Sequence, residues 1–166
     1  MTEIMVRRAT PGDVDAMLPI WREMMELHQR VEPARWTMVR NAETLYRDLL
    51  ATCLEDPERL IAVAVRDGHV VGFVHAGKGR RPPVVEDNVF GSLDTLCVTP
   101  AARRQGIGRA LVAEAMKWFQ AQGLTNAEVG YALANPLSGP FWTAMGFRPF
   151  MVRALRKVDQ QSETEE

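Results

Sequence analysis

Gly106 and Gly108, separated by a single residue, follow a pair of arginines and open a segment with helical periodicity. An apolar, β-prone run over residues 93–98 comes just before them. A strand that leads through such a loop into a helix leaves unpaired backbone N–H groups at the helix start, where the helix dipole also favours negative charge. Glycines let the backbone approach a ligand closely, and the arginines add cationic donors. These residue types and spacings predict a phosphate or diphosphate site.

Other common phosphate loops do not match this segment. The P-loop requires Gly-Lys-Ser or Gly-Lys-Thr, and the sequence contains no Lys-Ser or Lys-Thr pair. The dinucleotide-binding pattern requires a small residue three positions after its second glycine, where this chain has Leu111. The pattern Arg103-x-x-Gly106-x-Gly108 instead resembles the acetyl-CoA loop of the GNAT family of N-acetyltransferases. An ordinary surface loop at a helix start is the alternative that the loop alone leaves open.

Size and composition narrow the class of protein. The 166 residues predict one domain with a substantial core, over residues 1–158, followed by a polar, acidic tail over residues 159–166. The net charge of −1 gives no electrostatic case for binding nucleic acid. No apolar run approaches a membrane span and no signal-peptide pattern occurs, so we expect a soluble, cytoplasmic protein that binds no membrane. Cys53 and Cys97 are too few for a disulfide framework, and no His/Cys spacing suggests a metal site.

The first half of the chain predicts strand, two helices and a hairpin. An opening strand near residues 4–9 is followed by TPGD at residues 10–13, which is typical of a helix start. Pro19 lies inside the helical pattern and is expected to kink the helix or to end it early. A second helix is expected over residues 36–54. Two apolar runs around the Asp-Gly pair at residues 67–68 predict a β-hairpin.

The second half adds strands at residues 93–98, 126–134 and 147–158, the helix after the glycine loop, and a short helix at residues 136–145. This order predicts an α+β fold with a mixed, mostly antiparallel central sheet flanked by helices. It is also the order of elements in the GNAT fold. His75, at the end of a hairpin strand, is expected at the surface.

Two further motifs support the resemblance. In the GNAT family, the strand after the glycine-loop helix is followed by an asparagine and by a short helix that ends in aromatic-x-x-x-Gly-Phe. Here Asn135, Trp142 and Gly146-Phe147 stand at those positions, and the start of the chain (VRRATPGD) resembles the family's first strand and helix. With three separated motifs in order, the sequence is identified as a member of the GNAT family. The resemblance implies transfer of the acetyl group of acetyl-CoA to a primary amine by direct attack.

Trp142 departs from the family pattern. Tyrosine is the usual residue at this position and is thought to protonate the departing thiol, but an indole N–H is no usable acid. Tyr131 and Ser138 are the hydroxyl groups nearby in sequence that could substitute. A thiol with a pKa of about 8.5 also leaves tolerably as thiolate, so the missing tyrosine need not abolish turnover.

The resemblance also implies how the cofactor is held. Loop amides and arginines of residues 103–109 would bind the diphosphate, and the backbone of residues 96–98 would pair with the pantetheine arm like another strand. A backbone N–H near Val98 would bind the oxyanion. The expected cofactor contacts are Leu96, Cys97, Val98, Arg103, Arg104, Gln105, Gly106, Ile107, Gly108, Arg109, Asn135 and Trp142.

The acceptor amine must lose a proton before it attacks, because a free alkylamine has a pKa of about 10.4. A carboxylate has to take this proton, directly or through water. Asp94 on the predicted strand is the first choice, with Glu86 or Asp87 just upstream as the second. The expected catalytic group is therefore Asp94, Glu86, Val98 and the position of Trp142.

Two other functions stay open. Trp142 also suits a CoA-binding GNAT-like module with little or no turnover, regulatory or structural in role. A nucleotide-phosphate binder of unrelated fold requires the agreement at Asn135 and Gly146-Phe147 to be coincidence. The acceptor, a small-molecule or protein amine, is not specified by the sequence, and a homodimer is expected because such proteins are often dimers.

Overall fold

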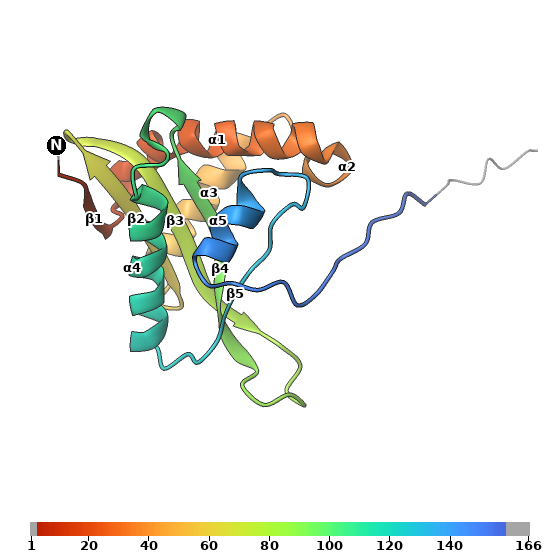
Figure 1. Cartoon of the computed structure of the whole chain (residues 1–166). Coiled ribbons are helices and arrows are strands. Elements are labelled where there is room, and N and C mark those ends of the chain that lie inside the picture. The colour runs from red at the N-terminus through yellow and green to blue at the C-terminus, as the bar shows by residue number, and fades with distance from the viewer. Residues whose placement is uncertain (1–2, 159–166) are drawn as a thin grey trace, which may run out of the picture.

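A five-stranded sheet forms the centre of the protein, as a computed structural model that describes residues 3–158 shows (Figure 1). The strands lie in the order β1-β2-β3-β4-β5, and all neighbours are antiparallel except β4 and β5, which are parallel. The predicted α+β fold with a mixed, mostly antiparallel sheet is therefore confirmed. The strands are β1 (Met5–Arg8), β2 (Arg59–Arg66), β3 (His69–Arg80), β4 (Val89–Val98) and β5 (Ala127–Val129).

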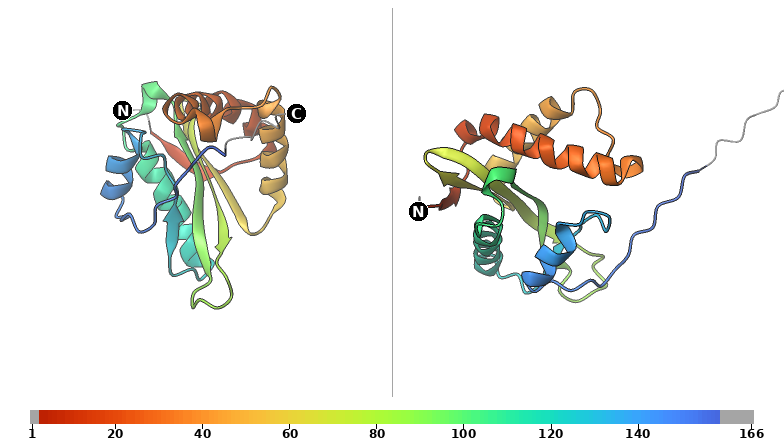
Figure 2. Two further views of the ribbon diagram at one scale, coloured as in Figure 1. Left: turned by 90° about the vertical axis from the view of Figure 1, so that its right-hand side faces the viewer. Right: turned by 45° about the horizontal axis from the view of Figure 1, so that its top comes forward.

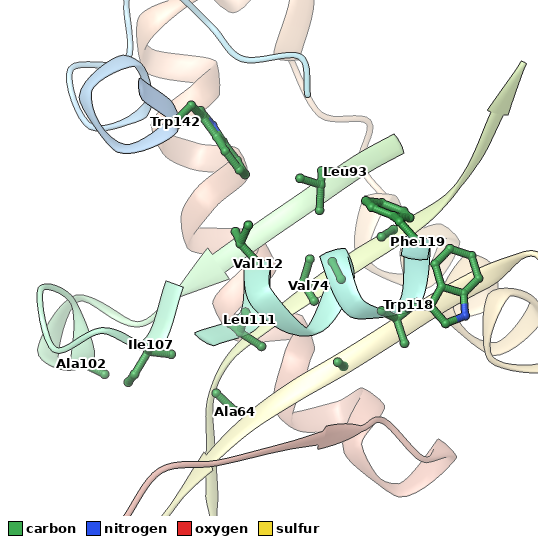
Figure 3. Close-up of a cluster of buried hydrophobic side chains, with 14 residues drawn as sticks. Ala64, Val74, Leu93, Ala102, Ile107, Leu111, Val112, Trp118, Phe119 and Trp142 are labelled. Atoms are coloured by element: carbon green, nitrogen blue, oxygen red, sulfur yellow. The ribbon is translucent and has the colours of Figure 1, made fainter. Parts of the chain in front are cut away.

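Helices cover both faces of the sheet. Buried side chains of α1 and α3 form one apolar cluster with the sheet, and those of α4 and α5 form the other. Figure 3 shows the second cluster, in which Leu111 and Val112 of α4 lie against Val74 and Leu93 of the sheet. The helices are α1 (Val14–Val31), α2 (Pro33–Trp36), α3 (Ala42–Glu55), α4 (Ile107–Ala121) and α5 (Ser138–Ala144).

The structure tests three of the helices and turns that the sequence predicts. The hairpin is confirmed, with Asp67 and Gly68 at positive φ in the turn between β2 and β3. Of the two effects expected of Pro19, an early end of the helix is wrong, because α1 runs through it, and a kink stays a prediction. Pro19 is exposed, so the carbonyl that loses its helical hydrogen bond can be hydrated. The second helix is divided into α2 and α3 by residues 37–41.

The expected strands of the last third are the least accurate predictions. The strand over residues 126–134 is only the short β5, and residues 147–158 form neither helix nor strand. A strand requires a hydrogen-bonding neighbour, and no described segment of the chain lies beside residues 148–158 in a ladder. The tail at residues 159–166 lies outside the described residues, so the division into domain and tail stays a prediction.

Two absences apply to the described part of the chain. Within residues 3–158, no cluster of three or more His, Cys, Asp or Glu side chains is arranged to bind a metal ion. None of the helices described is both long enough and apolar enough to span a bilayer.

Candidate active site

The parallel strands β4 and β5 separate after a short pairing. They are joined only through Gly91, Ser92 and Leu93 of β4, so the rest of β4 faces no described strand on that side. We call residues 95–98 of β4, which follow Asp94, the open edge. Along its other side, β4 remains paired with β3. The open edge can therefore accept hydrogen bonds from, and donate them to, an extended ligand.

The pairing with β3 shows which peptide groups face the opening. Thr99 N–H donates to Val71 O at 2.9 Å, which makes them a hydrogen-bonded pair that faces β3. Since such pairs alternate with non-hydrogen-bonded ones, Cys97 opposite Phe73 also faces β3. Leu96 and Val98 face the opening instead. Two of the three backbone positions expected to meet the pantetheine arm, Leu96 and Val98, are thus placed for it, and Cys97 is not.

A β-bulge sits at Asp94. Leu93 pairs with Ala76 and Thr95 with the preceding residue of β3, which leaves Asp94 as the extra residue of β4. Arg59 Nη1 donates to Asp94 Oδ2 at 2.8 Å, and the Ser92 hydroxyl donates to Oδ1. The carboxylate is about one-third exposed. The bulge therefore presents an oriented carboxylate directly next to the open edge.

The loop before α4 has the backbone of an anion site. Arg104 and Gly106 both have positive φ, 60° and 83°, and alternate with residues of ordinary φ, so that successive N–H groups turn to one side. The described residues provide no acceptor for the N–H groups of residues 104–109, the last three of which begin α4. These donors and the helix dipole favour an anion such as the predicted diphosphate.

Gly108 lies where α5 packs closely on the first turn of α4. A Cβ added here would lie 3.1 Å from the ring of Phe141 in α5, which is closer than ordinary contact. A larger side chain would either displace α5 or project toward the loop amides. The close packing of α5 on α4 therefore explains the second glycine of the motif.

The arginines of the loop divide into two roles. Arg103 turns away from the loop: its Nε donates to Val98 O at 3.0 Å and its Nη2 to Glu23 at 3.3 Å, so it ties the loop to β4 and α1. Arg104 and Arg109 are exposed, and their side chains form no hydrogen bond or ion pair with the described residues. They are the cations available to a phosphate, whereas Arg103 is left with a positioning role.

Gln105 and Asn135 also have structural contacts. Gln105 donates to Ala101 O at 3.0 Å and accepts from Arg66. Asn135 is buried, and its Oδ1 accepts from Leu137 N–H at 3.0 Å, which shapes the turn before α5. The side-chain N–H₂ of Asn135 has no acceptor among the described residues and stays available to a ligand.

Cys97 is buried beneath α1 and contacts Met24, with its Sγ 3.3 Å from the Met24 sulfur. Burial raises the pKa of the Cys97 thiol, so its thiolate is strongly disfavoured. The side chain of Cys97 lies in the core and its peptide group faces β3, so this geometry does not favour the predicted cofactor contact of Cys97.

Trp142 is a core residue of α5. It is only 6% exposed, and its ring makes edge contacts with Phe141 and Phe147 at centroid distances of 5.0 and 5.4 Å. Figure 3 shows the indole pointing from α5 into the same cluster as Val112 and Leu93. Trp142 therefore packs the core in this structure, and its expected place in the catalytic group stays a prediction that this burial does not favour.

Glu86 lies at the wrong end of the sheet. It is exposed in the loop that joins β3 and β4, and the last pair before that loop is Arg80 with Val89. Seven residues of β4, or about 23 Å at the usual strand rise, separate Val89 from Leu96. Figure 1 places this loop at the end of the sheet opposite the start of α4. Glu86 and Asp87 therefore lie far from the open edge in this structure, and Asp94 is the better placed of the predicted candidates for the base.

The structure adds residues that the sequence did not indicate. His75 is buried, not exposed as expected, and its Nε2 and the hydroxyl of Tyr46 have no hydrogen-bond partner among the described residues. Burial lowers the pKa of His75, and the nearby Asp94 opposes this effect. The alternation of β3, in which His75 shares a face with Phe73, is the signal that could have placed it. No sequence signal singled out Arg59, which pairs with Asp94 across the sheet.

Comparison with known proteins agrees with this geometry. The profile of the acetyltransferase (GNAT) family matches residues 21–147, and the chain belongs to this family. It is 37% identical over 102 residues to the aminoglycoside N(6′)-acetyltransferase type 1 of Klebsiella aerogenes, covering 59% of this chain and 64% of that protein. It is 32% identical over 130 residues to the mycothiol acetyltransferase of Frankia alni, covering 73% of this chain.

The chain spans only part of these relatives, about a third of the mycothiol acetyltransferase and under two thirds of the aminoglycoside enzyme. Two solved structures share its fold. A tetramutant of the BH1408 protein from Bacillus halodurans has a TM-score of 0.83 at 17% identity, covering 93% of this chain and 99% of that one. The aminoglycoside N-acetyltransferase AAC(6′)-Iy in complex with CoA has a TM-score of 0.75 at 16% identity, covering 95% and 96%.

Proposed function

We propose that this protein is an N-acetyltransferase that transfers the acetyl group of acetyl-CoA to the primary amine of a small molecule. The observation that carries the proposal is that the open edge of β4 leads directly into a loop of unpaired N–H groups. The N–H groups of residues 104–109, with Arg104 and Arg109, would bind the diphosphate. Leu96 and Val98 would pair with the amides of the pantetheine arm as another strand does.

The reaction requires little more from the chain than orientation and one proton acceptor. After the substrate ammonium loses one proton to the base, the amine nitrogen attacks the thioester carbon and the C–S bond breaks. The departing thiolate then takes a second proton from this nitrogen, or one from water. The Val98 N–H faces the opening and would bind the oxyanion. Since a thiol with a pKa of about 8.5 leaves without a strong acid, packing of Trp142 in the core is compatible with turnover.

Asp94 is the proposed general base. Its carboxylate lies beside the open edge and is held in place by Arg59 and Ser92. It would accept the proton of the substrate ammonium through a water molecule, since both of its oxygens already have a donor. The amine substrate would approach the open edge from the face of the sheet that α1 and α3 cover. The thioester of acetyl-CoA would approach it from the side on which β4 and β5 separate.

The class of acceptor is proposed from the relatives. The names of the two similar enzymes, an aminoglycoside acetyltransferase and a mycothiol acetyltransferase, refer to small molecules. We extend this to a small-molecule amine here, with a protein amine as the alternative, and expect the reaction to take place in the cytoplasm in a homodimer.

The test is CoA release over a panel of amines, with Gly108→Glu as the key variant. Glutamate at this position adds bulk between α4 and α5 and negative charge beside the loop amides, so acetyl-CoA binding should weaken by about a hundredfold or more. Circular dichroism checks that the variant stays folded. Gly12→Glu is the matched control, because it adds the same charge near the exposed start of α1 and should bind normally. Unchanged acetyl-CoA affinity in a folded Gly108→Glu protein would refute the loop assignment.

A second function is favoured by one observation, the ion pair that neutralises Asp94. If that pair persists in the complex, the protein is a CoA-binding module with little turnover. Tight acetyl-CoA binding in calorimetry, together with no CoA release over any amine of the panel, would select the module. ATP that competes as well as CoA would instead indicate a general nucleotide-phosphate site.

A further inference from the structure

Two polar side chains are buried without a partner on the face of the sheet that α1 and α3 cover (Figure 2). His75 of β3 is 4% exposed and Tyr46 of α3 is 9% exposed. Neither the imidazole Nε2 nor the tyrosine hydroxyl has a hydrogen-bond partner among the described residues. Such unpaired atoms are rare in folded proteins, because burying one costs free energy. An imidazole nitrogen that is kept free in this way can accept a proton.

The register of the sheet places His75 beside the proposed base. His75 pairs with Thr95 of β4, and the bulge next to this pair leaves Asp94 as the extra residue. Residues directly opposite one another in a sheet have Cβ atoms about 4.5–5.5 Å apart, so the imidazole and the bulge are close neighbours. The Thr95 side chain also lies near the Tyr46 hydroxyl. The two unpartnered groups and the carboxylate therefore form one cluster.

The charged groups around this imidazole act on it in opposite directions. Burial lowers the pKa of His75, the Asp94 carboxylate raises it, and the Arg59 guanidinium lowers it. Tyr46 and both cysteines, which belong to the apolar cluster on this face, are uncharged near neutral pH because burial raises their pKa values. Glu23 of α1 is paired with the loop arginine, and the buried side chains of α1 on this face are apolar. His75 is therefore neutral at pH 7, and the nearby carboxylate favours its protonated form.

We propose that His75 receives, by way of Asp94, the proton that the substrate ammonium releases, and holds it while the acetyl group is transferred. This inference rests on the proposed function. An N–H bond of the ammonium breaks, the proton passes through water and the Asp94 carboxylate, and a new N–H bond forms at the imidazole. After CoA leaves, the imidazolium returns the proton to solvent, so no other reactant is needed.

The usual pKa values of the two side chains explain this division of roles. The usual pKa of an imidazole, about 6.5, lies much nearer to neutral pH than that of an aspartate, about 3.9, so an imidazole holds a proton more firmly. Asp94 lies beside the open edge, and both of its oxygens already accept hydrogen bonds, which suits it to guide a proton inward. His75 acts through Asp94 and does not touch the substrate, so it is a positioning residue.

The first experiment measures the pKa of His75 in the full chain by NMR, without substrate. The chain has three histidines, so replacing the other two singly by glutamine assigns the His75 signal by elimination. This pKa should fall in Asp94→Asn, because burial then acts unopposed, and rise in Arg59→Gln, which removes a repelling cation. Asp56→Asn, near the same arginine, is the matched control and should leave the pKa unchanged. A pKa that does not respond to Asp94→Asn would overturn the proposal.

The second experiment measures kcat/KM against pH, with acetyl-CoA and the amine of the panel that is acetylated fastest. The wild-type value should fall as the pH drops through the His75 pKa found by NMR. His75→Gln should remove this acidic limb and lower kcat/KM by about a hundredfold, with acetyl-CoA affinity unchanged. His69→Gln is the matched control, since His69 is exposed in the turn between β2 and β3 and should behave as the wild type. Circular dichroism checks the fold of both variants.

The outcomes separate this inference from the proposed function. A wild-type acidic limb that does not coincide with the His75 titration would overturn the role of His75 and leave acetyl transfer standing. The same holds if the limb persists in a folded His75→Gln protein. A wild type that releases no CoA over any amine would overturn both, and is recognised before any variant is made. The wild-type comparison requires no change at His75, so it decides the question even if His75→Gln does not fold.

Discussion

At the scale of single residues, neighbours decide what each charged group can do. Asp94 is next to the open edge because a bulge re-aims it, and Arg59 fixes its orientation. Asp13 is held in the same way by Arg7 at the start of α1, yet this pair is structural, since it lies at the opposite edge of the sheet. The same chemical group is thus proposed to serve catalysis in one place and stabilises the fold in the other.

Asp94→Asn should lower kcat/KM by about a hundredfold to ten-thousandfold, which is the usual contribution of a general base. The remaining activity should rise more steeply with pH than in the wild type, because deprotonated amine must then come from solution. Asp56→Asn removes a carboxylate near the same arginine and should have little effect on either measurement. A pH–rate profile unaltered by Asp94→Asn would exclude Asp94 as the base.

Asp13 should stabilise the fold in a pH-dependent manner. Its carboxylate accepts two hydrogen bonds from Arg7, each 2.8 Å long, and one from Thr10 N–H at 2.7 Å, and these contacts lower its pKa. A lowered pKa in the folded state gives stability that is present above the unfolded pKa of about 4 and is lost as the pH falls below it.

Asp13→Asn should therefore reduce the free energy of unfolding by about 1–3 kcal/mol at pH 7, and the difference should shrink toward pH 3. Urea unfolding at both pH values measures this. Asp15→Asn, at an exposed carboxylate two residues further along, should change the stability by less than about 1 kcal/mol. An equal loss of the free energy of unfolding at both pH values would show that the negative charge of Asp13 does not contribute to stability.

At the scale of elements, the packing of α5 on α4 helps to position the glycine loop, which joins β4 to α4. Phe141 of α5 lies against Gly108, and Phe119 of α4 lies against Gly91 at the point where β4 still pairs with β5. Each glycine marks a close approach of a ring to backbone. These two contacts hold the helices in place on either side of the opening.

Gly91→Ala should destabilise the protein by about 1–3 kcal/mol, because the added Cβ would lie 2.6 Å from the Phe119 ring and α4 would have to shift. Gly130→Ala is the control, since a Cβ there has open space. Thermal unfolding of both variants measures the difference. A Gly91→Ala protein as stable as the control would mean that α4 adjusts freely on the sheet.

The elements also show what sequence could predict. The helix that begins at the glycine loop, the hairpin and the order of the elements as far as α5 depend on local signals and were predicted correctly. The bulge at Asp94, the turning of Arg103 toward Glu23 and the burial of His75 depend on contacts between distant segments, which local patterns do not contain. The final strand was wrongly predicted because its pattern is present while its neighbour is not.

At the scale of the whole molecule, the described part of the fold leaves strand edges unpaired along the open edge of β4 and at both ends of the sheet, on β1 and β5. The open edge of β4 leads directly into the glycine loop, which suits an elongated ligand with phosphate at one end. Gly108→Glu should disrupt ligand binding there.

A strand with unsatisfied amides also has a cost in crowded solution, since it is a template for β-rich aggregates. A bound cofactor that fills the open edge of β4 would act as a shield for it. We expect acetyl-CoA at a hundred times its Kd to raise the free energy of unfolding by about 2.7 kcal/mol and to delay the onset of turbidity on heating. Gly108→Glu should lose this protection, so the supply of its own substrate would govern how long the enzyme survives.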